Sequence, residues 1–507
     1  MEGRNRSLWR TTMAELFGAD LRSLAVFRIS LALLILLDLI NRSTDLTAHY
    51  TDLGVLPRGV GISPIPSGWP LSLHFMSGAP HVQVGLFLLA ALFAVALLIG
   101  YHTQWVTVAS WLLLASLHMR NPLVLQDGDT LLRMLLFWAM FLPLGARYSW
   151  DSIRTASAHP LPARIVSMGT VALFAQIVFV YWFTAVHKSG AEWWQEGSAV
   201  YYALNLDRLA TPVGLFLLNF PLLLPPLTYA VIWFEVVGPL LLFMPVYTGP
   251  VRTTVVCAFW CLQLGFGLCL TLGLFPWISA VAMLPFVPMW TWDKLLAWRP
   301  IACVGEALCE KSVSARLVGA GSMTSSGARP PTLKPSRLAN ALAVFFLLYV
   351  LLWNLSTIKE PLVKMPEHFA WLGALLQVQQ HWNMFAPRPP KFSGWYVILG
   401  ALQNGAQIDP FQDGRAVRWE KPALVSATYK NQRWRKYLRN IFKKKNRRHR
   451  LYFAQYLCRE WNTRHEENEQ LAKVEIHFMR ENTLPQPQVA VPYRIVLWKH
   501  SCSQTAQ

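Results

Sequence analysis

Long apolar stretches are the feature of this chain that most constrains its fold. Of its 507 residues, 54% are hydrophobic and only 14% are charged, which is not the composition of an ordinary soluble enzyme. About 20 apolar residues cross a bilayer as a helix, and we count about nine such stretches. They lie near residues 24–41, 82–100, 105–120, 131–146, 168–187, 228–247, 253–272, 274–292 and 338–356. The sequence therefore predicts a mainly α-helical, polytopic bundle of about nine transmembrane helices.

Basic residues between these stretches predict how the chain is oriented. With the N-terminus in the cytoplasm, the inner loops hold more Lys and Arg than the outer loops, as the positive-inside rule requires. Arg4, Arg6 and Arg10 precede the first stretch, which lacks a small-residue cleavage site, so we interpret it as an anchor rather than a signal peptide. Nine crossings then place the residues after about 357 outside the cell membrane.

The chain divides into segments of different composition. Serine, glycine and proline dominate the region before the last span, and such a composition predicts a flexible cytoplasmic linker. The predicted segments are a cytoplasmic N-terminal segment (1–23), a membrane domain of about eight helices (24–296), the linker (297–337), the last span (338–356) and an extracytoplasmic domain (357–507).

The last segment has the patterns of a small α+β domain. Alternation at 395–399, a turn signal at Asn404–Gly405 and a return at 406–408 predict a β-hairpin. Residues 430–467 have a helical pattern, and 473–478 and 493–498 predict further strands.

Two other features of this domain leave alternatives open. Cys458 and Cys502 both lie outside, where a disulfide is permitted but not required. The basic run from Lys443 to Arg450 contributes much of the +19 net charge. It is either a solvated surface or a site of attraction to anionic headgroups of the lipid bilayer. We expect no nucleic-acid partner for a domain on this side.

Ionisable residues from separate parts of the sequence lie near the outer ends of the predicted spans. Lys188 follows the fifth span, and an ionisable residue at this depth is costly and usually marks a site. Thr184 and Tyr181 precede it on the same helix face. Asp129 and Arg133 are spaced i,i+4 and can pair. The other candidates at this depth are Tyr50, Asp52, Asp127, His187, Glu192, Trp193 and Glu235.

Simpler structural explanations exist for each of these residues. Lys188 can extend its amine to the headgroups from a helix end. Asp129 and Arg133 can form a structural pair, and Trp193 can belong to an aromatic belt at the interface. The shared depth of so many ionisable groups favours a functional site. No spacing of Cys and His is typical of a zinc site, and we expect no metal.

Several segments resemble a known family of membrane proteins. They are residues 50–58 (YTDLGVLPR), 126–129 (QDGD), 141–145 (FLPLG), 149–151 (SWD) and 185–193 (AVHKSGAEW). They resemble the HTTM family, which contains the vitamin K-dependent γ-glutamyl carboxylases and bacterial relatives, and the likeness covers about residues 20–295. Residues 379–387 resemble a segment that follows the last span in bacterial members. The resemblance also implies a bacterial inner membrane as the location.

The resemblance implies an enzyme that acts on a lipid-soluble quinol, such as reduced vitamin K. It gives Lys188 the role of catalytic base, with Asp129 and His187 as further catalytic candidates. The residues grouped as quinol- or substrate-binding are Tyr50, Asp52, Asp127, Arg133, Tyr181, Thr184, Glu192, Trp193 and Glu235. The carboxylases carry a histidine near the place of Gly128, where this chain has Asp127 and Asp129. Quinol epoxidation coupled to carboxylation of glutamate, quinol oxidation alone, and other chemistry on a lipid or peptide therefore all stay open.

Two functions of other classes compete with an enzyme. A non-catalytic membrane factor would bind or mature a partner protein or peptide through residues 357–507. A transporter is permitted by the intramembrane charges, but the sequence shows no inverted repeat and no paired broken helices.

Overall fold

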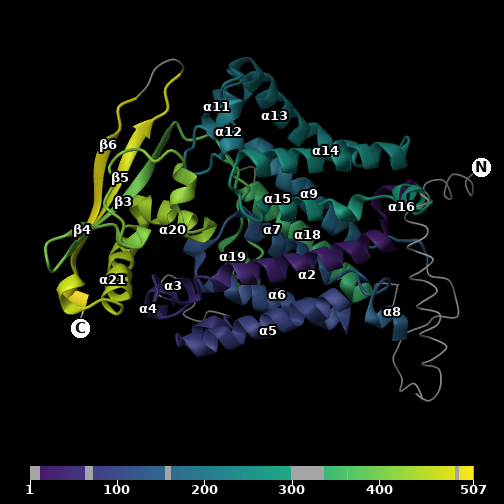
Figure 1. The fold of residues 1–507 in the computed structure, drawn as a ribbon. Coiled ribbons are helices and arrows are strands. Elements are labelled where there is room, and N and C mark those ends of the chain that lie inside the picture. Colours follow the sequence, from purple (N-terminus) through teal and green to yellow (C-terminus); the bar gives the residue numbers. More distant parts are fainter. Residues whose placement is uncertain are drawn as a thin grey trace, which may run out of the picture.

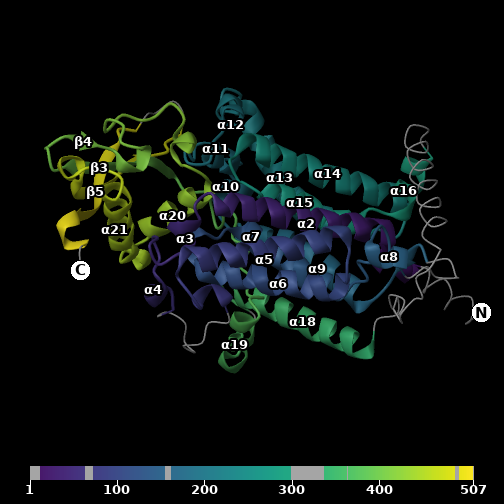
Figure 2. The same ribbon diagram turned by 60° about the horizontal axis from the view of Figure 1, so that its bottom comes forward.

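The computed structural model describes residues 12–62, 72–154, 162–297 and 336–505, with the exception of 362 and 486–489. Long helices lie side by side in an elongated bundle, and the C-terminal domain sits at one end of it (Figures 1 and 2). Six helices are long and apolar enough to cross a membrane, which supports a multi-pass membrane protein. They are α2 (Leu21–Ser43), α5 (Pro80–Ile99), α9 (Met168–His187), α13 (Leu224–Leu241), α14 (Thr248–Cys269) and α18 (Arg337–Ser356).

Three of the nine predicted spans do not meet the same criteria, so the count of nine is not confirmed. α6 (Thr103–Arg120) is as long as α13, but threonine, serine, histidine and arginine side chains make it less apolar. α7 (Asp127–Ala139) has 13 residues, about 20 Å of helix, which is shorter than the hydrocarbon core. α15 (Phe275–Ala282) is shorter still and is followed by the 3-10 turn Leu284–Phe286.

Local signals in the sequence explain where the main helices begin and end. Asp20 precedes α2, and its carboxylate accepts a hydrogen bond from the backbone N–H of Arg22. Pro80 starts α5, which ends at Gly100 in the left-handed conformation that glycine adopts without strain. Ser167 caps α9 through a reciprocal bond with Thr170.

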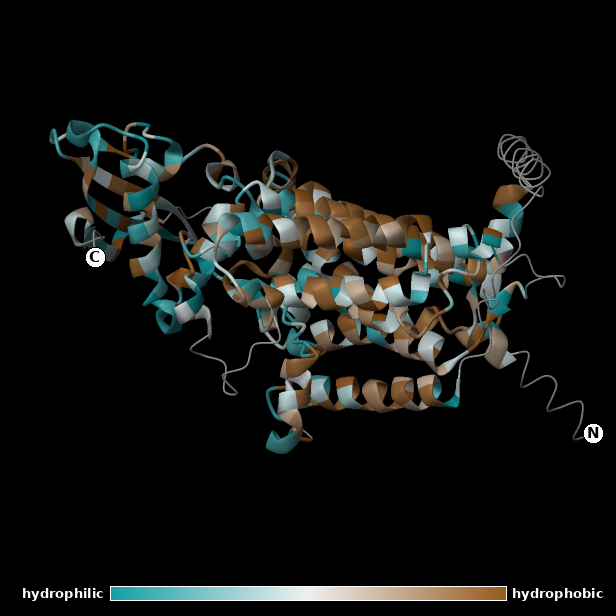
Figure 3. Cartoon of the chain, turned by 90° about the horizontal axis from the view of Figure 1, so that it is seen from below, coloured by the Kyte–Doolittle hydropathy of each residue, from teal (hydrophilic) through white to brown (hydrophobic). Residues whose placement is uncertain are grey.

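Burial separates the central helices from those on the outside of the bundle. In α2 and α9, 61% and 72% of the apolar window is buried, whereas in α5 and α18 only 22% is. Large apolar side chains such as Leu88, Leu92 and Leu264 are more than half exposed on the outer helices. Figure 3 shows hydrophobic residues along much of the length of these helices, and a lipid environment would cover the exposed apolar side chains.

Short elements close the two ends of the bundle. At the end next to the C-terminal domain lie α3 (Leu46–Tyr50), α4 (Arg58–Ile62), α10 (Ala191–Trp194), α11 (Ala199–Leu204), α12 (Pro212–Leu217) and α19 (Glu367–Leu375) (Figure 2). At the other end lie α8 (Trp150–Arg154) and α16 (Met289–Leu296) (Figure 1). A two-stranded sheet of β1 (Ala19–Asp20) and β2 (Arg164–Ile165) joins two connecting segments.

The C-terminal domain has an antiparallel sheet with strand order β4-β3-β5-β6. Its strands are β3 (Phe392–Leu402), β4 (Gln407–Ile408), β5 (Leu471–Asn482) and β6 (Tyr493–Ser501). The predicted hairpin is confirmed, with Gly405 at a positive φ of 85° in its turn. The predicted helical region is two helices, α20 (Gln432–Phe442) and α21 (His449–Asn462).

The core of this domain continues into loops at the adjacent end of the bundle. Trp434 and Tyr437 of α20 pack in one cluster with Val55, Leu56 and Val124, which all precede α7 in the sequence. The two parts of the protein therefore share buried apolar contacts. The predicted linker, 297–337, lies outside the described residues apart from its ends.

Cys458 and Cys502 form a disulfide that joins α21 to the turn after β6 across 44 residues. We expect Cys458→Ser/Cys502→Ser to lose about 2–4 kcal/mol of domain stability, because the crosslink restricts the unfolded chain. Thermal unfolding of the purified full-length protein measures this loss. The matched control is Cys257→Ser/Cys261→Ser, since these two cysteines are free and exposed on α14. Peptide mapping that finds free thiols at both Cys458 and Cys502, in protein purified without reductant, contradicts the bond.

Candidate functional site

The amine of Lys188 is buried in an ion pair just after the end of α9. Its Nζ lies 2.7 Å from Oε1 and 2.6 Å from Oε2 of Glu235 on α13. The two side chains are 3% and 6% exposed. The ring of Trp193 faces the same amine, with its centroid 4.1 Å from Nζ. The amine is thus held inside the protein and does not extend to the headgroups.

The backbone around Lys188 is held by the segment that follows the last apolar helix. Trp194 donates a side-chain hydrogen bond to the carbonyl of Lys188. The indole of Trp193 donates to the carbonyl of Phe385, and the N–H of Gly190 donates to the carbonyl of Pro387. Residues 379–387 resemble a family segment in the sequence. Their backbone carbonyls therefore help to hold in place the turn that contains Lys188.

A cavity of about 590 Å³ opens beside the Lys188–Glu235 pair. Thr184 and Tyr181 line it, as their spacing from Lys188 predicts, and the Tyr181 hydroxyl accepts a hydrogen bond from Gln263 of α14. The rest of the wall is largely apolar along α11 to α15, and residues between 383 and 390 and basic side chains of α20 complete it. The predicted site residues that line this cavity are Asp127, Tyr181, Thr184, Lys188, Trp193 and Glu235.

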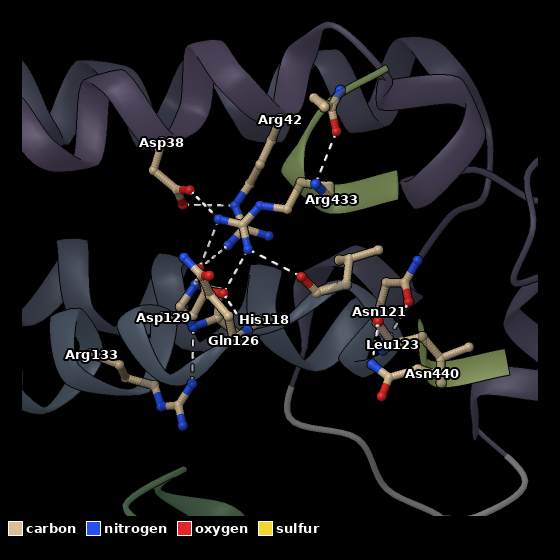
Figure 4. A network of polar contacts seen from close by, with 12 residues as sticks. Asp38, Arg42, His118, Asn121, Leu123, Gln126, Asp129, Arg133, Arg433 and Asn440 are labelled. Carbon is tan, nitrogen blue, oxygen red and sulfur yellow. Dashed lines mark hydrogen bonds and ion pairs between the residues drawn. The ribbon is translucent and has the colours of Figure 1, made fainter. Parts of the chain in front are cut away.

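Other predicted residues belong to a second group of buried charges, the arginine–aspartate cluster of Asp38, Arg42, Asp129 and Arg433 (Figure 4). Arg42 on α2 contacts Asp38 and Asp129 at 2.6 Å each. Arg433 of the C-terminal domain contacts the same two carboxylates at 2.5 and 2.6 Å. Tyr50 joins this cluster, because its hydroxyl accepts a hydrogen bond from Arg42. The predicted ionisable residues therefore do not form one site: some line the cavity beside Lys188, and others belong to the arginine–aspartate cluster.

The predicted pairing of Asp129 with Arg133 is not what the structure contains. Asp129 is the third residue of α7, and its carboxylate turns back to accept the N–H of Gln126 in a capping box. It therefore faces away from the next turn of the helix. Arg133 donates instead to the carbonyl of Gln377 and contacts the ring of His118 on α6.

The cluster also has the geometry of a possible metal site. Ligand atoms of Asp38, His118 and Asp129 lie within 4.8 Å of one another. Arg42 and Arg433 already donate to both oxygens of each carboxylate. Because guanidinium groups supply the positive charge that a metal ion would bring, this arrangement favours an ion-pair network.

Besides Arg133, three predicted site residues lie outside both the cavity lining and the cluster. Each has a local partner: Asp52 pairs with Arg58 at 2.8 Å, His187 contacts Thr357 at 3.1 Å, and Glu192 pairs with Lys391 at 2.6 Å. These contacts hold loops and helix ends near the cavity. We therefore place none of the three next to the Lys188 amine.

Sequence reasoning missed the contribution of α20. Its apolar residues follow a helical spacing, which predicts an amphipathic helix, and its basic residues lie between them. Arg433 enters the cluster, whereas Arg435, Lys436 and Arg439 line the cavity. The pattern could have identified a basic face, but it could not have identified the carboxylates and the cavity that this face meets.

We expect Arg433→Met to destabilise the protein by about 3–5 kcal/mol, because it leaves buried carboxylates short of a partner. Thermal unfolding of the full-length protein in detergent, followed by size-exclusion chromatography, measures the change. Arg435→Met is the matched control on the same helix, since Arg435 forms no ion pair within the described residues. Equal stability of Arg433→Met and Arg435→Met would show that the cluster does not hold the domain.

No family model, no curated protein and no solved structure matches this chain. The resemblance of its short segments to the HTTM family therefore stays a prediction. A proposal of function depends on the chemistry of the site.

Proposed function

We propose that this protein is an integral membrane enzyme in which Lys188 acts as a base on a lipid-soluble quinol, as in the HTTM family that the sequence resembles. The observation that carries the proposal is a nearly dry amine, paired with a single carboxylate, on the wall of a largely apolar cavity. Such surroundings disfavour charge and make a lysine available as a base near neutral pH.

The cavity suits a quinol in size and in lining. Its volume lies within the usual range of small-molecule sites. Leu227, Val231 and Phe266 supply an apolar wall for a ring and a hydrocarbon tail. Leu227 is also 38% exposed and belongs to a helix apolar enough to cross a membrane, which suits entry of a quinol from the lipid. A bound quinol would supply an acidic phenol and a reductant for oxygen.

The residues around the amine have complementary roles in this proposal. A proton shared by Lys188 and Glu235 can rest on the carboxylate, because two neutral groups are favoured in a dry site. The free amine can then accept a phenolic proton, and the protonated Glu235 stays beside the ammonium as a neutral hydrogen-bond acceptor, while the phenolate balances the charge. Trp193 covers the amine and keeps water from it.

We expect Lys188→Ala to reduce epoxide formation by about 10²–10⁴-fold, the range over which a general base contributes. Purified full-length protein is given reduced vitamin K and oxygen, and the epoxide is quantified by chromatography. Lys359→Ala, which removes an exposed lysine after α18, is the matched control and retains full turnover. Glu235→Gln is expected to fall between the two, because it keeps the shape of the carboxylate but cannot take the proton.

Equal turnover by wild type and Lys188→Ala would remove this lysine from the mechanism. Absence of epoxide from the wild type would remove quinol oxidation itself. Unchanged elution and thermal unfolding of each variant are required before activities are compared, because an unpaired Glu235 also costs stability.

A second candidate function is favoured by the edge of the C-terminal sheet. β6 pairs only with β5 in the described part of the chain, and Tyr493 and Val496 on it are exposed. A free edge strand can accept an extended segment of a partner protein or peptide. If host cells that carry the Lys188→Ala gene keep the full phenotype of cells that carry the wild-type gene, this non-catalytic role is favoured.

A further inference from the structure

Basic side chains dominate the polar part of the cavity lining. Three come from α20 of the C-terminal domain, namely Arg435, Lys436 and Arg439. The others, besides Lys188, are Arg208, Arg388 and Lys443. The acidic residues of the lining are Asp127 and Glu235, and Glu235 is already paired with Lys188. The cavity therefore has a large excess of positive charge.

Most of these cations have no acidic partner. Arg388 lies 4.0 Å from Glu192, whereas Arg208, Arg435, Lys436, Arg439 and Lys443 form no ion pair with any carboxylate in the described ranges. Exposed arginines and lysines are commonly unpaired, but Arg208, Arg435 and Lys436 are half-buried. Unpaired charges are costly where water is partly excluded.

The pKa values of two of these cations are lowered, as expected where positive charge is in excess and water is partly excluded. Burial lowers the pKa of Lys436 to about 8, against the opposing effect of Asp127. Burial, with Arg439 nearby, lowers the pKa of Arg208 to about 9. Each shift means that the folded protein disfavours these cations, and a bound anion would relieve that cost.

The cations meet an apolar wall. α20 belongs to the C-terminal domain at one end of the bundle, whereas Leu262, Phe266 and Val231 belong to helices apolar enough to cross a membrane (Figures 1 and 3). One cavity thus combines cationic side chains with a hydrocarbon-like surface. Its chemistry is that of an amphiphile with an anionic head group and a long apolar chain.

We propose that the cavity binds an anionic phospholipid, with its phosphate at Arg435, Lys436 and Arg439 and an acyl chain against α13 and α14. This inference goes beyond the proposed function and does not rest on it, because the phospholipid is a second ligand that shares the apolar wall with the quinol. Binding requires no turnover, so a failure of epoxidation leaves the binding result unaffected.

The test uses full-length protein in phosphatidylcholine nanodiscs that contain a phosphatidate with a photoreactive group near the end of one acyl chain. After illumination, labelled peptides are mapped by mass spectrometry. We expect phosphatidate to label the α14 peptide that contains Leu262 and Phe266 more than the equivalent phosphatidylcholine probe does. Labelling of α5, an outer helix that does not line the cavity, serves as the internal reference.

Charge variants test the head-group site. Arg435→Gln/Lys436→Gln/Arg439→Gln is expected to lower the selective labelling by at least about tenfold, because each of these basic residues attracts the anionic head group. The matched control, Lys444→Gln/Lys445→Gln/Arg447→Gln, removes the same charge from exposed positions outside the cavity and leaves labelling unchanged. Equal losses in the two triple variants would overturn the proposal in favour of general surface attraction.

A competition experiment uses only the wild-type protein, so its result does not depend on whether a variant folds. Excess unlabelled phosphatidate suppresses labelling of the α14 peptide, whereas inorganic phosphate and phosphatidylcholine leave it unchanged. Suppression by inorganic phosphate would overturn the lipid as occupant and identify a site for a free anion. Suppression by phosphatidylcholine would overturn the requirement for negative charge.

Discussion

The buried pairing of Arg42 and Arg433 with Asp38 and Asp129 is the interaction on which the rest of this structure depends. Two cations and two anions neutralise one another in a place where any one of them alone would be strongly unfavourable. Because Arg433 belongs to the C-terminal domain, the charges on α2 and α7 are satisfied only when that domain is docked. The apolar contacts of Trp434 with the loops that precede α7 strengthen the same interface.

Docking of α20 has a direct consequence for the cavity beside Lys188. The same helix that supplies Arg433 to the cluster presents Arg435, Lys436 and Arg439 to the cavity. The apolar helices contribute an amine, a carboxylate and an apolar wall, and the C-terminal domain contributes positive charge. The chemistry of the site is thus shared between two parts of the chain that are more than 150 residues apart.

Much of the fold was predictable because its signals are local. Apolar length predicts the six long helices, and alternation with a glycine turn predicts the β3–β4 hairpin. The count of nine spans was less secure, because α7 and α15 are apolar but short. In the site, the face shared by Tyr181, Thr184 and Lys188 follows from helical spacing. The pairing of Asp129 with Arg133 failed because the capping box competes for the carboxylate.

By itself, then, the sequence determined that the protein has apolar helices long enough to cross a membrane, that the strands of its C-terminal domain alternate, and that Lys188 is a candidate. Each of these features depends on residues that are neighbours in the sequence. Only the tertiary structure decided that Glu235 is the partner of Lys188, that Asp129 belongs to a different cluster, and that Arg433 completes that cluster. These choices depend on which helices pack together and how each is rotated. Ionic partners lie far apart in the chain, and no local pattern specifies which opposite charge a buried group will meet.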